Sequence, residues 1–247
     1  MNGAQALLTT LVDNGVRVCF ANPGTSEMHF VAALDTVPAM RGVLTLFEGV
    51  ATGAADGYAR MSGDPAAVLL HLGPGLGNGL ANLHNARRAH VPMLVVIGDH
   101  ATYHKKYDAP LESDIDSVAG TVSGWLRRTI DVAEVASDAV EAVISARQYR
   151  HIASLILPAD TSWTGGAEDA KAVAAQSPTP IGDSETVTTA LRSGEPTAIL
   201  IGGDATRAAG LDAATRLAQT FGAKLFCETF PARLERGAGL PLSLIHI

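Results

Sequence analysis

The 247-residue chain is 47% hydrophobic and 17% charged, which is enough apolar material for one or two α/β domains with ample cores. Its formal net charge is −7 and it contains no basic run, which argues against nucleic acid or an anionic membrane as a partner. No apolar stretch approaches the roughly 18 residues that span a bilayer. The two cysteines, Cys19 and Cys227, lie far apart in apolar runs and predict buried thiols in a reducing, cytoplasmic compartment.

Short helical and strand patterns alternate through the first 158 residues. Such alternation predicts an α/β fold, a parallel sheet with helices on both faces. The expected helices are 3–14, 27–34, 48–61, 77–89 and 132–149, and the expected strands are 16–20, 43–47, 66–70, 93–97, 125–129 and 153–157.

The composition changes after residue 158. Residues 159–180 are rich in Ala, Gly, Ser, Thr and Pro, which predicts an interdomain linker. Part of a second α/β domain is expected over 181–242, because two helical patterns alternate there with two short apolar runs. The final LSLIHI resembles a translated sequencing adaptor, so we expect native sequence to stop near residue 240 and 243–247 to be a non-native tail. A short native edge strand is the alternative.

Glu48 is the residue around which the first domain is organised. It follows the apolar run 43–47 and precedes a segment rich in Gly and Ala. This pattern predicts a buried strand, then a closely packed helix, with Glu48 desolvated at their junction. A carboxylate there costs free energy unless a partner uses it. The alternative is an ordinary first-turn glutamate that complements the helix dipole.

Two other segments occur in order with the Glu48 segment LTLFEGVATGAADGYAR (44–60). They are ANPGTSE (21–27) and HLGPGLGN (71–78). Together the three resemble the thiamine-diphosphate enzymes related to acetolactate synthase and benzoylformate decarboxylase. The resemblance is close over 1–158 and looser afterwards. It implies a flavodoxin-like pyrimidine-binding domain (1–158), followed by part of a middle α/β domain.

The resemblance implies cofactor roles for five residues. In the family the glutamate that matches Glu48 accepts a hydrogen bond from the aminopyrimidine ring. That bond favours the imino tautomer, which removes the thiazolium proton and generates the ylide. The turn at Pro23 and Gly24 resembles the one that packs against the pyrimidine, although an ordinary turn needs the same residues. Gly75 and Asn78 fall in the third matching segment and are also expected to bind the cofactor.

Thr25 and His71 are the expected substrate-facing residues. Thr25 matches a small hydroxyl residue near the substrate, and helix capping is its alternative role. His71 matches a histidine of benzoylformate decarboxylases that assists proton transfer, so it is expected to be catalytic as well; histidine titrates near neutral pH. A core or capping histidine is the alternative. Acetolactate synthases usually have a small residue at this place, which leaves the branch of the family open.

The family holds the cofactor diphosphate through Mg2+, on a separate domain with a GDG motif and a distant Asn. This chain has no GDG, so it supplies at most half of a site, and Mg2+ would bind to a domain absent from it. FAD, which some synthases bind at the middle domain, is not supported by any motif here. No metal site is predicted within the chain. Asp99, His100 and His104 are interpreted as solvated loop residues rather than ligands.

The resulting hypothesis is an N-terminal fragment of a 2-oxo acid decarboxylase or carboligase resembling the acetolactate synthase large subunit. The alternatives are a benzoylformate decarboxylase-like lyase that does not ligate, and a non-catalytic assembly subunit of the same fold. The resemblance implies a 2-oxo acid substrate and a homodimer or homotetramer formed through the pyrimidine domain. The fragment alone is expected to be inactive. The identity of the 2-oxo acid cannot be derived from these residues.

Overall fold

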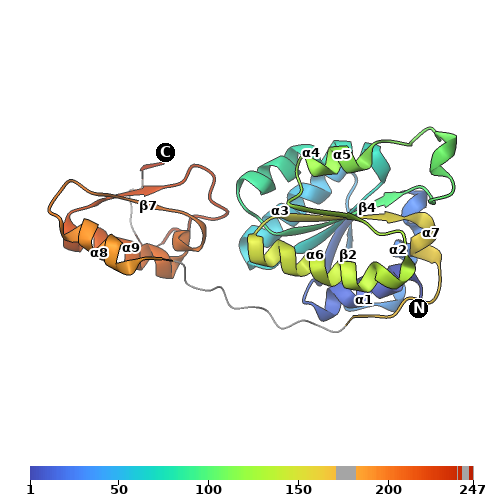
Figure 1. The fold of residues 1–247 in the computed structure, drawn as a ribbon, viewed down its shortest axis with the longest axis horizontal. Helices are drawn as coiled ribbons and strands as arrows, with labels where there is room; N and C mark the ends of the chain where they lie inside the picture. Colours follow the sequence, from blue (N-terminus) through green and yellow to red (C-terminus); the bar gives the residue numbers. More distant parts are fainter. Residues whose placement is uncertain (171–181, 238, 241–244, 247) are drawn as a thin grey trace. The chain divides into compact units, whose positions relative to one another are not determined.

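The structure is a computed structural model that describes all residues except 171–181, 238, 241–244 and 247. The chain divides into two compact units, Met1–Gln176 and Ser177–Ile247 (Figure 1). Each unit has its own sheet and core and is described by itself. Among the described residues, no helix combines the length and the hydropathy needed to cross a membrane.

The first unit contains a six-stranded sheet with the order β2-β1-β3-β4-β6-β5, and every neighbouring pair is parallel. This confirms the predicted parallel α/β fold. The strands are β1 (Val18–Asn22), β2 (Arg41–Leu44), β3 (Ala66–Leu70), β4 (Met93–Asp99), β5 (Trp125–Arg128) and β6 (Ile152–Pro158).

Helices cover both faces of this sheet. In Figure 1, α1 and α6 lie on one face and α3, α4 and α5 on the other. Short 3-10 turns, η1 (Thr25–Glu27), η2 (Lys105–Tyr107) and η3 (Val132–Glu134), connect some of the elements. The helices are α1 (Gly3–Asp13), α2 (Met28–Thr36), α3 (Glu48–Ser62), α4 (Leu72–Arg88), α5 (Ile115–Gly120), α6 (Val135–Tyr149) and α7 (Ala159–Trp163).

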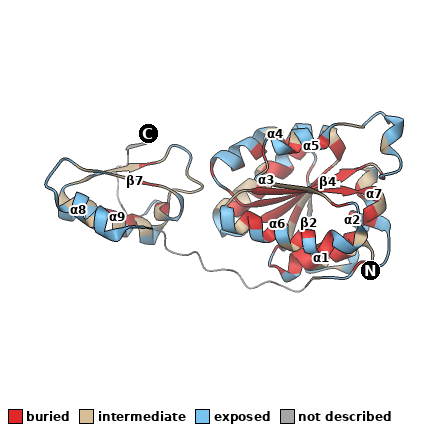
Figure 2. Ribbon diagram, viewed as in Figure 1, coloured by how far each residue is buried: buried red, intermediate tan, exposed pale blue. Residues whose placement is uncertain are grey.

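The core lies between the sheet and these helices (Figure 2). β3, β4 and β6 are buried along their whole length, as expected for central parallel strands. On the α1 and α6 face, Leu7 and Leu11 pack with Leu94 and Leu155 in one apolar cluster. Both cysteines are free and buried, as predicted, and burial raises the pKa of Cys19 to about 12.

Two predicted element boundaries are wrong near the Glu48 segment. The run 43–47 is not a buried strand: β2 is an edge strand that ends at Leu44, whose side chain is 72% exposed. Edge position explains this, because β2 pairs only with β1 and lacks a neighbour on its other side. The helix predicted over 77–89 also begins earlier than expected. Helix α4 starts at Leu72, with His71 as its N-cap, so Gly75 and Asn78 are both helical.

The first unit also continues beyond the predicted boundary at residue 158. Helix α7 occupies the start of the predicted linker, and its Thr161 and Ser162 are buried. Asn2 forms an antiparallel bridge with Gly165, which fixes the chain to the N-terminus after α7. Most of the remaining linker prediction falls on 171–181, outside the described residues.

The second unit is a small parallel α/β layer. Its sheet has the order β7-β8-β9, and Ile201, Leu211, Ala214 and Cys227 form its core. Strand β9 falls within the predicted tail, so the non-native origin of that tail stays a prediction. The elements are α8 (Ser184–Arg192), β7 (Ala198–Ile201), η4 (Gly203–Thr206), α9 (Ala208–Phe221), β8 (Lys224–Cys227) and β9 (Ile245–His246).

Candidate functional site

The order of the strands locates a crevice in the first unit. The chain leaves β1 to form β2 on one side and then crosses to β3 on the other side of β1. Ligands of open α/β sheets bind at the carboxyl ends of strands where the order reverses in this way. Pro23 and Gly24 follow β1 there, and His71 follows β3, with Asn22 and Leu70 paired in the sheet. The fold therefore brings two of the three predicted segments together.

Glu48 is the first residue of α3, and its side chain points toward the first turns of α4. The residue is only 7% exposed, which confirms the predicted desolvation. Asn78 donates a hydrogen bond from Nδ2 to Glu48 Oε2 over 3.0 Å. A Cβ placed on Gly75 would lie 3.4 Å from Glu48 Oε1 and 3.4 Å from the Cβ of His71. Gly75 thus separates Glu48 from His71 and keeps the space between them open.

Small residues let α3 and α4 hold Glu48 in place. Asn82 donates from Nδ2 to the carbonyl of Gly49 over 2.7 Å, and the Thr52 hydroxyl lies 3.2 Å from the carbonyl of Gly79. A Cβ on Gly53 would lie 2.9 Å from the Asn82 amide nitrogen, and one on Gly79 would lie 2.9 Å from a Thr52 methyl. Gly53 and Gly79 therefore allow the close contact of the two helices.

His71 contacts the side chain of Glu27, a residue that sequence reasoning did not select. Its Nδ1 lies 2.8 Å from Glu27 Oε2, which also accepts the backbone N–H of Gly24 over 2.8 Å. Glu27 is 2% exposed. The only sequence signal was an acidic residue three positions after the Gly24 turn. Glu27 and His71 are 44 positions apart in the sequence, so local sequence patterns give no sign of this contact.

Two glycines make room for this pair. A Cβ on Gly24 would lie 2.4 Å from the His71 ring, and one on Gly98 would lie 1.6 Å from Glu27 Oε1. Oε1 is buried and has no hydrogen-bond partner among the described residues. Burial raises the pKa of Glu27, while the hydrogen bond from Gly24 and the contact with His71 oppose that rise. The cost of burying Glu27 is consequently offset by fewer hydrogen bonds than a fully paired structural carboxylate makes.

Thr25 is the first residue of η1 and is exposed. The alternative capping role for Thr25 is wrong, because Gly24 is the N-cap of η1 and Glu27 is the N-cap of α2. The side chain of Glu27 reaches back to accept the backbone N–H of Gly24. Thr25 therefore does not cap either helix and lies next to the Gly24 turn.

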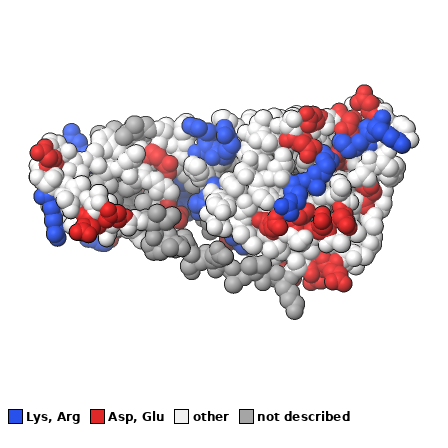
Figure 3. Space-filling model, in the orientation of Figure 1, with Lys and Arg blue, Asp and Glu red and all other residues white. Residues whose placement is uncertain are grey.

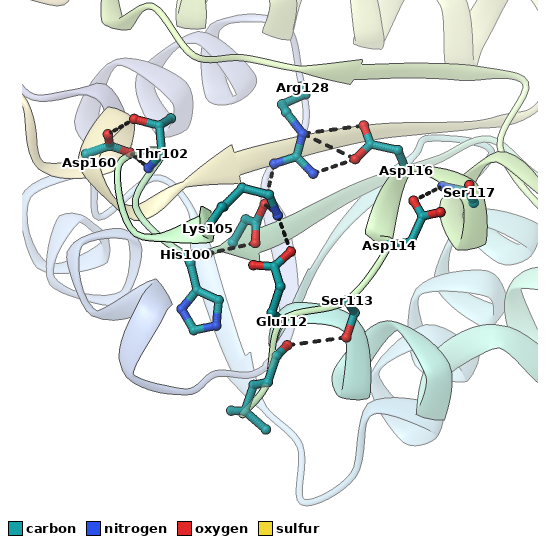
Figure 4. Close-up of polar contacts among 12 residues, drawn as sticks. His100, Thr102, Lys105, Glu112, Ser113, Asp114, Asp116, Ser117, Arg128 and Asp160 are labelled. Atoms are coloured by element: carbon teal, nitrogen blue, oxygen red, sulfur yellow. Dashed lines mark hydrogen bonds and ion pairs between the residues drawn. The ribbon is translucent and has the colours of Figure 1, made fainter. Parts of the chain in front are cut away.

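A second polar cluster lies beyond the end of β4 (Figure 4). The interpretation of Asp99 as a solvated loop residue is wrong, because it ends β4 and is fully buried. Lys105 Nζ lies 3.0 Å from Asp99 Oδ2, and Arg128 pairs with the same oxygen. Lys105 also pairs with Glu112, and Arg128 with Asp116. These ion pairs anchor the segment that follows β4.

The rest of this segment has further anchors but no metal cluster. Thr102 donates its backbone N–H to Asp160 of α7 over 3.0 Å (Figure 4). The His100 and His104 rings lie 5.5 Å apart. Within the described ranges, no group of three or more His, Cys, Asp or Glu side chains is placed to hold a metal. On the face drawn in Figure 3, basic atoms of the first unit are bordered by acidic ones, consistent with local charge pairing.

Comparison with known proteins finds a family match within the first unit. Residues 1–120 match the family described as "Thiamine pyrophosphate enzyme, N-terminal TPP binding domain". The resemblance to the thiamine-diphosphate enzymes is thus confirmed. The chain is 71% identical over 241 residues to the "Putative acetolactate synthase large subunit IlvX" of Mycobacterium tuberculosis, covering 98% of this chain and 47% of that protein.

Both branches of the family are among the relatives. Benzoylformate decarboxylase of Pseudomonas aeruginosa is 41% identical over 85 residues, which cover 34% of this chain and 16% of that enzyme. The solved 4-hydroxybenzoylformate decarboxylase of Rhodococcus jostii RHA1 superposes with a TM-score of 0.79 at 22% identity, covering 94% of this chain and 45% of that one. That similarity confirms the fold. The chain spans about half the length of these longest matches.

Proposed function

We propose that this chain supplies the glutamate half of the active site of a thiamine-diphosphate-dependent 2-oxo acid decarboxylase or carboligase similar to acetolactate synthase. The observation that carries the proposal is the Glu48 carboxylate. It is 7% exposed, lies close to Gly75 on α4, and among the described residues its side chain receives one hydrogen bond, from Asn78 to Oε2. Oε1 faces Gly75 and is available to a ligand.

The residues present fit the aminopyrimidine end of the cofactor. A flat heterocycle needs close backbone approach, which Gly75 allows, and a carboxylate beside its ring nitrogen, which Glu48 provides. When bound, thiamine diphosphate supplies the electron sink that accepts the electrons released as carbon dioxide departs. Glu48 would hold or accept a proton at Oε1, and Asn78 would keep its other oxygen in place. His71 lies beside Gly75, where it could exchange a proton with substrate.

Mg2+ and the diphosphate group would bind to a domain outside this chain, so the chain by itself should release no carbon dioxide from a 2-oxo acid. The benzoylformate decarboxylase-like alternative is favoured by one specific observation, the His71–Glu27 pair. A histidine held in this way suits decarboxylation followed by protonation, which needs an acid at the site. The two reactions differ in the fate of the decarboxylated product, which is either protonated or added to a second 2-oxo acid.

The test uses a chimera in which residues 1–240 are joined to the remaining half of the M. tuberculosis relative, 71% identical over the shared part. Hydrogen–deuterium exchange at the thiazolium carbon of bound cofactor is measured in Glu48→Gln. Gln keeps the size but is a far weaker proton acceptor, so exchange should slow about 100- to 10,000-fold. Glu141→Gln, on the exposed face of α6, is the matched control and should exchange normally. Unchanged exchange in Glu48→Gln with normal cofactor binding would remove Glu48 from this role.

We also propose that a second copy of the chain covers the surface beside Glu48. Leu44, Leu46, Phe47 and Val50 are 72%, 90%, 48% and 56% exposed, an unusual concentration of large apolar side chains. Sedimentation of the wild-type chain should show at least a dimer, and Leu46→Lys should shift it toward monomer. A wild-type monomer at micromolar concentration would contradict the homo-oligomer proposal.

A further inference from the structure

The Glu27–His71 pair has a geometry that specifies where the histidine proton sits. Glu27 Oε2 accepts the backbone N–H of Gly24, so this oxygen already acts as an acceptor in a direction fixed by the backbone. The same oxygen lies 2.8 Å from His71 Nδ1. The simplest arrangement that satisfies both contacts has Nδ1–H donating to Oε2, because the tautomer of a histidine follows the bond made by its other nitrogen.

The assignment follows for an ionised Glu27. Both oxygens of a carboxylate are acceptors only, so His71 Nδ1 must donate to Oε2. The backbone N–H of Gly24 is a second donor to the same oxygen, which favours the carboxylate form.

We infer that Glu27 is a positioning residue that holds the proton of neutral His71 on Nδ1 and leaves the Nε2 lone pair as the proton-exchanging atom. Imidazole side chains free in water carry the proton mainly on Nε2, so Glu27 reverses the intrinsic preference. A proton taken up at Nε2 produces an imidazolium whose Nδ1–H remains bonded to Glu27. Its release at Nε2 restores the starting tautomer, so the ring need not rotate between the two steps.

The surrounding backbone is shaped to make this pairing possible. Any side chain at position 98 would place a carbon 1.6 Å from Glu27 Oε1, and any side chain at position 24 would overlap the His71 ring. Glu27 Oε2 is therefore held by the backbone N–H of Gly24, and Oε1 occupies the space that a side chain at position 98 would fill. The role of Nε2 toward substrate rests on the proposed function; the tautomer itself does not.

The test measures 15N shifts of the imidazole nitrogens in the histidine-labelled 247-residue chain, with His71 assigned by its loss in His71→Gln. The expected wild-type result is neutral His71 protonated at Nδ1. Glu27→Ala should lower the ratio of the Nδ1–H to the Nε2–H tautomer about 10-fold or more, since a hydrogen bond to a charged group is lost. Glu27→Gln should largely retain the ratio, because its amide oxygen can accept from both Gly24 and His71.

Glycine variants separate positioning from general damage. Gly98→Ala should displace Glu27 and lower the same ratio, whereas Gly57→Ala should leave it unchanged, because a Cβ at Gly57 meets nothing within 4 Å. Amide-resonance dispersion checks that each variant is folded. A wild-type proton on Nε2, or an unchanged ratio in folded Glu27→Ala or Gly98→Ala, would overturn the inference. Failure of the proposed function would instead appear as normal thiazolium exchange in the Glu48→Gln chimera, with the tautomer result intact.

Discussion

Glu27 and Asp99 are both almost completely buried at or near the carboxyl edge of the same sheet, but their partners differ. Asp99 forms ion pairs with two permanent cations, Lys105 and Arg128, which neutralise its charge. Glu27 faces an imidazole and a backbone amide, and one of its oxygens has no partner among the described residues. A matched carboxylate can fix structure, whereas an undercompensated one can exchange protons or bind a ligand.

Glu48 belongs with Glu27 in this comparison. It is buried, yet its side chain hydrogen-bonds the neutral amide of Asn78 and, among the described residues, no cation. The site carboxylates are thus held by glycines and amides, and the Asp99 cluster by ion pairs. Stability should therefore depend on the Asp99 cluster, and chemistry on the two glutamates. Both tryptophans, Trp125 and Trp163, lie in the first unit, so their fluorescence reports the unfolding of that unit alone.

The largest expected loss of stability follows from Asp99→Ala. Removing this carboxylate leaves Lys105 and Arg128 close together without their shared counter-ion, which typically costs about 3–5 kcal/mol. Urea unfolding followed by tryptophan fluorescence measures the change. Asp116→Ala is the control, because Asp116 is 50% exposed and a surface pair is worth about 0–1 kcal/mol. Equal losses in the two variants would show that Asp99 has no special structural role.

Lys105→Met should have an intermediate effect that depends on pH. Burial lowers the pKa of Lys105, but the hydrogen bonds to Glu112 and Asp99 outweigh it and raise the pKa above its ordinary value of 10.5. A base whose pKa is raised by folding stabilises the fold fully below 10.5, and loses that contribution as pH rises through the folded value.

The free energy of unfolding of Lys105→Met should accordingly lie about 1–2 kcal/mol below wild type at neutral pH. The gap should narrow as pH increases above 10.5, which urea titrations at several pH values can follow. Lys106→Met is the matched control, because Lys106 lies over the exposed Tyr107 ring. A gap that widens with pH would contradict the assigned sign.

The smallest effect on stability is expected for Glu48→Gln. If Glu48 serves chemistry, its loss removes only the interaction of a first-turn charge with the helix dipole, about 0.3–1 kcal/mol. The same fluorescence-detected unfolding measures this change beside Asp99→Ala. A loss comparable to that of Asp99→Ala would place Glu48 among the structural carboxylates and contradict its difference from Asp99.

The sequence by itself determined the parallel α/β fold and the burial of Glu48. Periodicity gave the alternation of elements, because apolar spacing reports directly which face of a helix or strand is buried. The desolvation of Glu48 followed from its place between an apolar run and small residues. Its contact with Asn78 did not follow, because the distance between α3 and α4 depends on how closely their glycines approach.

Only the tertiary structure decided three other features. The exposure of Leu44 and Leu46 depends on β2 being an edge strand, and strand order is not encoded in local apolar spacing. The burial of Asp99 depends on Arg128, which approaches from β5. Glu27 contacts His71 because β1 and β3 are neighbours, although the two residues are 44 positions apart in the sequence. Local pattern reports burial, whereas the partners of a buried charge are set by which strands lie side by side.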